Sequence, residues 1–281
     1  MSDSLESISV AIEAALVARN LRGMASVRPA LTEGYCLRAA RTLFNAKGNV
    51  LIGTGFPVTD TFETDGPLGA IALYRALETL GATPYIVCGA PLSKALQQDY
   101  RIVEIKVGKH HAQAQEAKEL LEQLQPDVVL SIERPGQAAD GHYYNMRGED
   151  ISARTACFDT FMNQASCPTI AIGDGGNEIG MGNVTEALKS LDIVAAATRC
   201  DELLVADVSN WGGYGLIAMM GCLAGEDLLA SLQPLEILHY LSNLGSVDGV
   251  TRLNQLTEDG LDVAVGDALI VQLRQLSGFA C

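Results

Sequence analysis

The sequence predicts an α/β fold in which helices cover both faces of a mostly parallel sheet, in three α/β/α layers. Short apolar segments alternate along the chain with segments whose apolar residues recur at helical spacing, which is typical of parallel strands joined by crossover helices. Apolar residues make up 48% and charged residues 19% of the 281 residues, as in globular proteins. No repeat or linker interrupts the sequence. We therefore expect a single α/β domain over residues 1–281, with an N-terminal helical extension over about residues 1–46.

The individual elements follow from local signals. Residues 4–20 have apolar side chains at helical spacing, and residues 32–46 form a second expected helix. Pro67 marks a helix start, because proline is favoured in the first turn, and Pro126 ends another helix. Strands are expected at residues 49–53, 84–88, 102–107, 127–132, 169–172 and 202–208, and the remaining helices at 67–80, 91–98, 111–124, 153–165, 185–191, 213–223, 235–243 and 266–276.

Charge and composition exclude several classes of partner. The net charge of −15 argues against nucleic acids and anionic membranes, which are themselves negative. The uncharged run at residues 210–225 is too short and too rich in glycine to span a bilayer. The acidic N-terminal segment differs from a signal or transit peptide, and the scattered cysteines form no Cys-x-x-Cys pair. We therefore expect a cytoplasmic protein with reduced thiols. A homo-oligomer is compatible with the sequence, which leaves the oligomeric state open.

A glycine-rich run at residues 173–183 is the strongest functional signal. Asp174, Asn177 and Glu178 stand between its glycines, and the run follows an expected buried strand, where open α/β sheets bind ligands. A Met-Gly pair replaces the lysine and hydroxyl of a Walker-type loop, and two carboxylates would repel a phosphate. We therefore expect no nucleotide cofactor; an amine, a cation or a metal fits better. The plain alternative is a tight turn whose Asp and Asn cap a helix.

Further polar clusters follow expected strands. Residues 63–69 open a helix whose free amides could hold a carboxylate, or form no more than a turn with a cap. Residues 133–150 are dense in ionisable groups, and their arginines could grip carboxylates through bidentate forks. The alternative for this segment is a solvated surface loop with internal salt bridges. Residues 209–215 hold Trp211, which is as compatible with the core as with a pocket wall.

Four motifs together resemble the D-glutamate cyclase family: TDGPLGA at 64–70, ERPG at 133–136, GHYYNMRG at 141–148 and GDGGNEIGMG at 173–182. They occur in matching order, and the resemblance spans roughly residues 20–280. The family is found as stand-alone proteins, which this chain resembles, and as the C-terminal part of longer mitochondrial proteins. The resemblance implies a lyase of D-amino acid metabolism that converts D-glutamate to 5-oxo-D-proline with loss of water.

This reaction sets chemical requirements that the clusters can meet. The α-amine must lose its proton to a base, and the carboxyl oxygen that leaves as water needs an acid, a metal or an arginine nearby. Glu133 or His142 would transfer the proton. If the glycine run opens a helix, Asp174 and Glu178 lie one turn apart on one face and would hold the ammonium or a metal ion.

The expected site residues fall into three groups. The catalytic residues are Glu133, His142, Asp174 and Glu178; the substrate-binding residues are Thr64, Asp65, Gly66, Arg134, Tyr144, Asn145, Arg147, Gly175, Gly176, Asn177 and Trp211; and the ligands of a Mn²⁺ or Mg²⁺ ion are Asp174, Asn177 and Glu178.

Two other functions stay open at this point. A metal-dependent hydrolase of a lactam or amide would use similar carboxylates, and a non-catalytic sensor could bind an acidic metabolite on the same sheet. The density of proton-active groups over residues 133–150 argues against the sensor. The expected partner of the cyclase is a small acidic amino-acid substrate.

Overall fold

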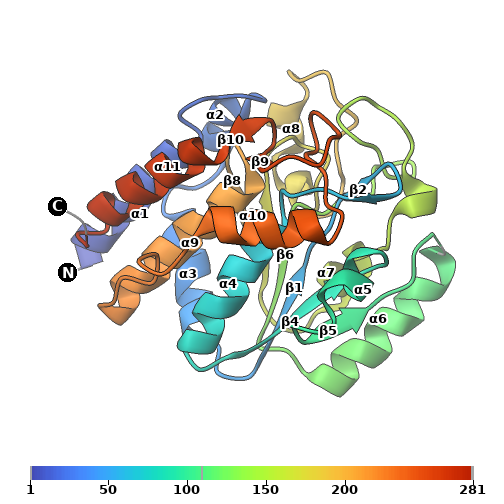
Figure 1. The fold of residues 1–281 in the computed structure, drawn as a ribbon, viewed down its shortest axis with the longest axis horizontal. Helices are drawn as coiled ribbons and strands as arrows, with labels where there is room; N and C mark the ends of the chain where they lie inside the picture. The colour runs from blue at the N-terminus through green and yellow to red at the C-terminus, as the bar shows by residue number, and fades with distance from the viewer. Residues whose placement is uncertain (1, 109, 280–281) are drawn as a thin grey trace.

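A six-stranded parallel sheet forms the centre of the protein. The computed structural model describes residues 2–108 and 110–279. The strand order is β5–β4–β1–β6–β7–β8, and every neighbouring pair in this sheet is parallel. The strands are β1 (Asn49–Gly53), β4 (Thr83–Cys88), β5 (Ile102–Glu104), β6 (Val128–Ile132), β7 (Thr169–Gly173) and β8 (Glu202–Val205). Helices lie on both faces (Figure 1), which confirms the three-layer α/β/α fold.

Each face of the sheet has its own apolar core. The first core packs the sheet against α1 (Ser2–Leu16), α3 (Tyr35–Asn45), α4 (Pro67–Thr79), α5 (Leu92–Leu96), α9 (Ser209–Ala224), α10 (Pro234–Asn243) and α11 (Val263–Leu276). The second packs it against α2 (Met24–Val27), α6 (His110–Leu124), α7 (Asp159–Gln164) and α8 (Thr185–Leu188). Along β6, Leu130 and Ile132 face the first core and Val129 the second, because strand side chains alternate between faces. Burial on both faces explains the continuous apolar runs in the sequence.

The strand order places a crevice at the middle of the sheet. From β1 the chain builds β4 and β5 on one side, then crosses to build β6, β7 and β8 on the other. The carboxyl ends of β1 and β6 therefore lie at the topological switch point, where open α/β sheets bind ligands.

Two expected helices differ from the structure. The helix expected over 153–165 is wrong in its first half: a 3₁₀ turn, Ser152–Arg154, is followed by extended residues, and Ala156 pairs with Val107 before α7 begins. The helix expected over 213–223 begins earlier, at Ser209, so that the glycines of the third cluster lie inside α9. There they permit close helix packing, because a Cβ on Gly213 would lie 3.5 Å from the Cα of Gly69 in α4.

Two short hairpins that the sequence reading missed stand outside the main sheet. β2 (Pro57–Val58) pairs with β3 (Thr61–Phe62), and β9 (Thr257–Glu258) pairs with β10 (Leu261–Asp262). The second hairpin turns through Asp259 and Gly260, with φ of 55° and 80°. An Asp-Gly pair suits such a two-residue turn because both positions need positive φ.

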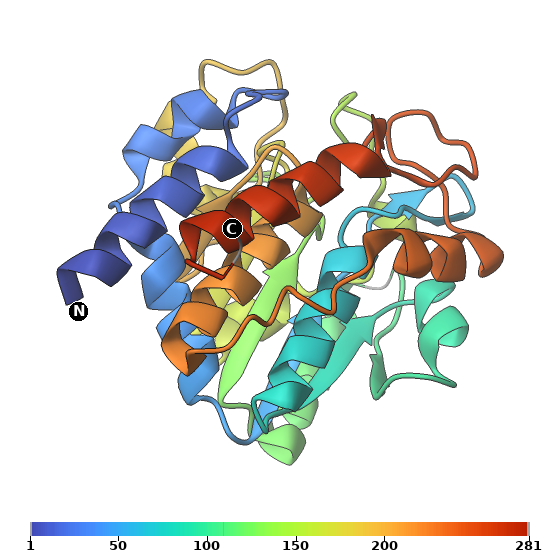
Figure 2. The same ribbon diagram turned by 60° about the vertical axis from the view of Figure 1, so that its left-hand side comes forward.

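The N-terminal segment, α1 and the loop that follows it, packs against the rest of the fold. Figure 2 shows α1 beside α11, and α1 also contacts α3 and α9. Beyond α1, the carboxylate of Asp207 accepts hydrogen bonds from the backbone N–H groups of Arg19 at 2.7 Å and Leu21 at 3.2 Å. This loop carries Arg22 to the crevice.

In the described part of the chain, no helix combines the length and apolarity that crossing a membrane requires. The cysteines within it are free thiols, and Cys281 lies outside the described residues.

Candidate active site

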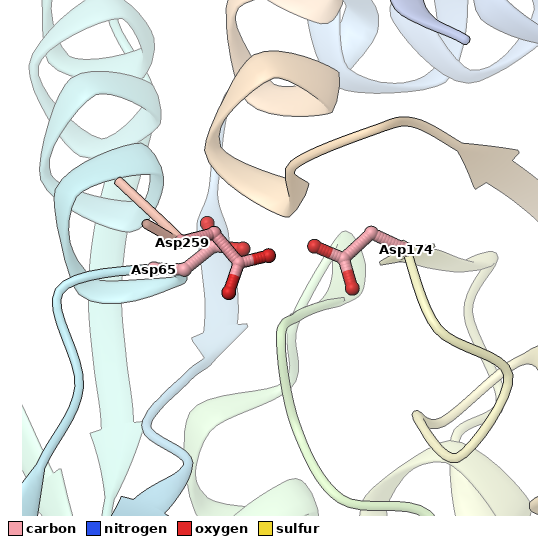
Figure 3. Close-up of side chains that lie close together, drawn as sticks. All are labelled: Asp65, Asp174 and Asp259. Atoms are coloured by element: carbon pink, nitrogen blue, oxygen red, sulfur yellow. The ribbon is translucent and has the colours of Figure 1, made fainter. Parts of the chain in front are cut away.

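Carboxylates from distant parts of the sequence meet at the crevice. Asp65 precedes α4, Glu133 follows β6, Asp174 follows β7, and Asp259 sits in the β9–β10 turn. In Figure 3, Asp65 and Asp259 lie on one side and turn toward Asp174 on the other. Oxygen atoms of Asp65, Asp174 and Asp259 lie within 4.8 Å of one another, and so do those of Glu133, Asp174 and Glu178. We call these two sets position 1 and position 2; they share Asp174.

The backbone around Glu133 explains part of the TDG and ERP motifs. Glu133 has a positive φ of 44°, an uncommon conformation for a residue with a side chain. Gly66 passes so close that a Cβ there would lie 2.7 Å from the Cβ of Glu133, and its own φ is 87°. Only glycine fits this approach without strain.

The N-terminus of α9 points at the acidic cluster. The Ser209 N–H donates to Asp65 at 2.9 Å and to Asp174 at 3.2 Å, and the Asn210 N–H donates to Asp65 at 2.7 Å. The Ser209 hydroxyl donates to Glu133 at 2.5 Å. These amides have no partner inside the helix, and the helix dipole favours negative charge at this end. The helix therefore helps to hold several acids in one place.

The glycine run folds back on itself and forms no helix between Asp174 and Glu178, so the helical spacing expected for the two acids is wrong. The Glu178 carboxylate accepts hydrogen bonds from the N–H groups of Gly175 at 3.0 Å and Gly176 at 2.7 Å. The Asn177 amide nitrogen donates to the carbonyl of Tyr144 at 2.9 Å. Its Oδ1 is buried and has no hydrogen-bond partner among the described residues.

Arg22 brings a positive charge into the cluster. One guanidinium nitrogen lies 2.7 Å from Asp174 Oδ1, and the other contacts Asp259. Although burial opposes it, the charges of Asp174 and Asp259 raise the pKa of Arg22. The arginine is therefore a permanent cation.

Burial makes the acids hold protons more tightly. It is the main cause that raises the pKa of Glu133, Glu178 and Asp174, with mutual repulsion added for Glu133 and with Arg22 opposing the shift for Asp174. Burial, then neighbouring charge, raises the pKa of Asp65 and of Asp259 to about 7. Carboxyl groups that titrate near neutral pH can take up and return protons. They also favour a bound cation, which relieves their repulsion.

A cavity of about 240 Å³ opens above the cluster. Its floor includes Arg22, Glu63, Glu133, Asp174, Asn177 and Asp259, and its mouth carries Arg147, Arg154 and Arg252. Arg252 pairs with Glu149 at 3.0 Å, whereas Arg147 makes no ion pair with a described residue and donates to the Val250 carbonyl at 3.4 Å. The cavity therefore offers buried carboxylates, with Arg22 among them, at one end and three further guanidinium groups at the other.

The structure brings together most of the expected site residues. Asp65, Gly66, Glu133, Asp174, Gly175, Gly176, Asn177 and Glu178 form or support the floor, and Tyr144, Asn145 and Arg147 lie on the loop at the mouth.

Four expected residues have other surroundings. Arg134 is buried, and its two terminal nitrogens donate to the carbonyls of Thr54 and Ala156, whereas its Nε has no hydrogen-bond partner among the described residues. His142 is exposed and lies 3.1 Å from Asp150, outside the cavity lining. Trp211 lies in the first core, outside that lining. The Thr64 hydroxyl donates to the Thr257 carbonyl at 2.8 Å and so holds the β9–β10 hairpin.

Three residues of the floor were missed by sequence reasoning. Asp259 could have been found, because Asp-Gly between short β-prone segments indicates a two-residue hairpin turn. Glu63 belonged to a recognised cluster but received no role. Arg22 stands in a loop without any local pattern, and only the folded chain places it beside Asp174.

A family model and a curated relative match this chain. The family model described as "D-glutamate cyclase-like, C-terminal" matches residues 12–274. The chain is 32% identical over 248 residues to the mitochondrial D-glutamate cyclase of Homo sapiens, and the match covers 76% of this chain but 40% of that protein. Among solved structures, an exopolyphosphatase-related protein from Bacteroides fragilis matches with a TM-score of 0.42 at 11% identity, over 88% of this chain and 57% of that one.

Proposed function

The chain belongs to the D-glutamate cyclase-like family, and from that premise we propose that it is a lyase that converts D-glutamate to 5-oxo-D-proline with loss of water. One observation carries the proposal: a single cavity has buried carboxylates on its floor and arginines at its mouth. Glutamate carries one ammonium and two carboxylates, so its charges complement both ends of this cavity.

The proposed orientation follows from the charges. The ammonium lies against the acidic floor, and the α-carboxylate lies against Arg147 at the mouth, which makes no ion pair with a described residue and donates to the Val250 carbonyl at 3.4 Å. The side chain of the substrate folds back so that its carboxyl carbon lies next to the amine. Holding this folded geometry means that the entropic cost of restricting the side-chain bonds is met on binding and not during the reaction.

The chemistry needs two proton transfers. The ammonium gives up two protons, a bond forms between the nitrogen and the side-chain carboxyl carbon, and one carboxyl oxygen takes up both protons and leaves as water. Glu133 is our candidate to carry them, because its carboxyl group lies on the cavity floor and the Ser209 hydroxyl fixes one of its oxygens. His142 is exposed and does not line the cavity, which does not suit this role.

The floor also fits a divalent metal ion. Glu133, Asp174 and Glu178 offer carboxylate oxygens within 4.8 Å of one another, and the unpartnered Oδ1 of Asn177 adds an amide oxygen. Mg²⁺ and Mn²⁺ prefer such oxygen ligands. When bound, the ion would supply positive charge against the leaving oxygen. The chain's own residues hold the substrate and move the protons.

The first experiment tests the reaction and compares the two isomers of glutamate as substrates. The purified protein is incubated with D-glutamate or L-glutamate, with and without Mn²⁺ or Mg²⁺, and 5-oxoproline is followed by chiral chromatography. The proposal expects metal-dependent 5-oxo-D-proline from the D-isomer alone. Folded protein that forms no product from either isomer overturns it. Incubation with 5-oxo-D-proline tests hydrolysis, so that a lactam hydrolase would be recognised by opening of the ring without net cyclisation.

A further inference from the structure

The acidic floor contains two adjacent cation positions. Position 1 is formed by Asp65, Asp174 and Asp259, and position 2 by Glu133, Asp174 and Glu178. Because Asp174 belongs to both, a cation in one position lies close to a cation in the other. Paired metal sites in enzymes have this form, with ions about 3.5–4 Å apart.

Arg22 already fills position 1. Its guanidinium lies 2.7 Å from Asp174 Oδ1 and also contacts Asp259, so two of the three carboxylates of this position are engaged by one side chain. The loop that carries it is anchored by Asp207 through the backbone of Arg19 and Leu21. Arg22 is therefore held both by the contacts of its guanidinium group and by the anchored backbone of its loop.

Position 2 has a feature that points to a ligand. Asn177 is 2% exposed, yet its Oδ1 has no hydrogen-bond partner among the described residues. Its amide nitrogen donates to the Tyr144 carbonyl, which fixes the orientation of the group. A Cβ on Gly175 would lie 3.1 Å from Asn177 Oδ1, 2.8 Å from Glu178 Oε1 and 2.5 Å from Met146 Sδ, so the two oxygens border one space beside this glycine, which they share with the Met146 thioether. A buried oxygen without a donor costs free energy that a cation would recover.

We propose that the site holds one divalent cation, in position 2, and that Arg22 excludes a second cation from position 1. The inference rests on the divalent-cation part of the proposed function. A guanidinium is always charged, and two charge-assisted contacts hold it against Asp174 and Asp259. A metal ion in position 1 would have to displace it and would repel the ion in position 2. Arg22 thus sets the metal count of the site.

Substitution of Arg22 tests this directly. Arg22→Met keeps much of the length of the side chain and removes its charge, which leaves Asp65, Asp174 and Asp259 without their cation. We expect Mn²⁺ titration followed by calorimetry and equilibrium dialysis to give one ion per chain in the wild type and two in Arg22→Met. The electron paramagnetic resonance spectrum should change from an isolated Mn²⁺ to a spin-coupled pair.

Matched variants separate the causes. Arg19→Met, in the same loop but exposed, should keep one ion per chain. Adding Asp259→Asn to Arg22→Met removes a ligand of position 1 alone and should return the count to one. If Arg22→Met does not fold, as judged by circular dichroism, Arg22→Gln is used, because its neutral amide can still donate to the acids.

Each outcome decides the matter. Two ions in the wild type, or a single ion in a folded Arg22 variant, overturn the inference while leaving metal-assisted cyclisation intact. No Mn²⁺ binding by the wild type overturns both the inference and the metal part of the proposed function. The expected counts without any 5-oxoproline formation leave the inference standing and overturn the proposed reaction.

Discussion

Glu258 should make the protein less stable as the pH rises. It is 1% exposed, and its Oε2 accepts hydrogen bonds from Asn210 and from the hydroxyl of Tyr214, both at 2.9 Å. Burial raises its pKa from an ordinary 4.5 to about 7, and these hydrogen bonds oppose the shift only in part. Between those two values the native state keeps a proton that the unfolded chain has released. The free energy of unfolding therefore falls as the pH rises through this window.

The size of the effect follows from the gap between 4.5 and about 7. At about 1.4 kcal/mol per pH unit, this gap corresponds to about 3 kcal/mol of stability that is present below pH 4.5 and lost above pH 7. Glu258→Gln has nearly the same shape and can still accept both hydrogen bonds, but it does not titrate. The free energy of unfolding of Glu258→Gln, relative to that of the wild type at the same pH, should therefore increase by about 3 kcal/mol between pH 4.5 and pH 8.

Urea unfolding of both proteins across that pH range measures this difference. Glu186→Gln, at an exposed position of α8, controls for the loss of a surface charge. Comparing differences between variants at each pH cancels the titration of all other groups. A difference between Glu258→Gln and the wild type that does not change with pH would refute the reasoning, because Glu258 would then not hold its proton in the native state.

Three further predictions concern the site. Asp174→Asn should lower turnover at least about 100-fold with an unchanged circular dichroism spectrum, because both cation positions lose their shared carboxylate; near-normal turnover contradicts the assignment. Arg147→Ala should raise KM for D-glutamate about tenfold or more while kcat changes less, as measured by steady-state formation of 5-oxoproline; an unchanged KM removes Arg147 from substrate binding. Gly66→Ala should destabilise the fold by about 3 kcal/mol in urea, because it adds a clash with Glu133 to the backbone strain. Gly81→Ala has a similar positive φ of 85° with open space around its Cβ and should cost only about 1–2 kcal/mol; equal losses would show that the clash adds nothing.

Residues that follow a strand could be placed from sequence. Glu133 and Asp174 stand directly after apolar segments, and the carboxyl ends of parallel strands meet at one edge of the sheet. Once the alternation of strands and helices was recognised, their meeting was therefore predictable. The same reasoning covers Asp65, which opens the helix after β1.

Contacts that depend on tertiary packing could not be placed in this way. The residue type of Arg134 suggested a carboxylate partner, but nothing local shows that backbone carbonyls of Thr54 and Ala156 would use its donors. The helix expected over 153–165 failed for a similar reason, since the pairing of Ala156 with Val107 competes with helix formation. Arg22 was missed because its partners lie far along the chain.

The wide spacing of the floor residues has a consequence for biosynthesis. Arg22 lies near the beginning of the chain, and Asp259 lies in a hairpin close to its end. A ribosome translates Arg22, Asp65, Glu133 and Asp174 well before it reaches β9. A nascent chain at that stage lacks Asp259 and therefore the complete floor, and we expect it to be inactive. If the proposed function holds, turnover requires the β9–β10 hairpin, and we expect no turnover by a chain that lacks it.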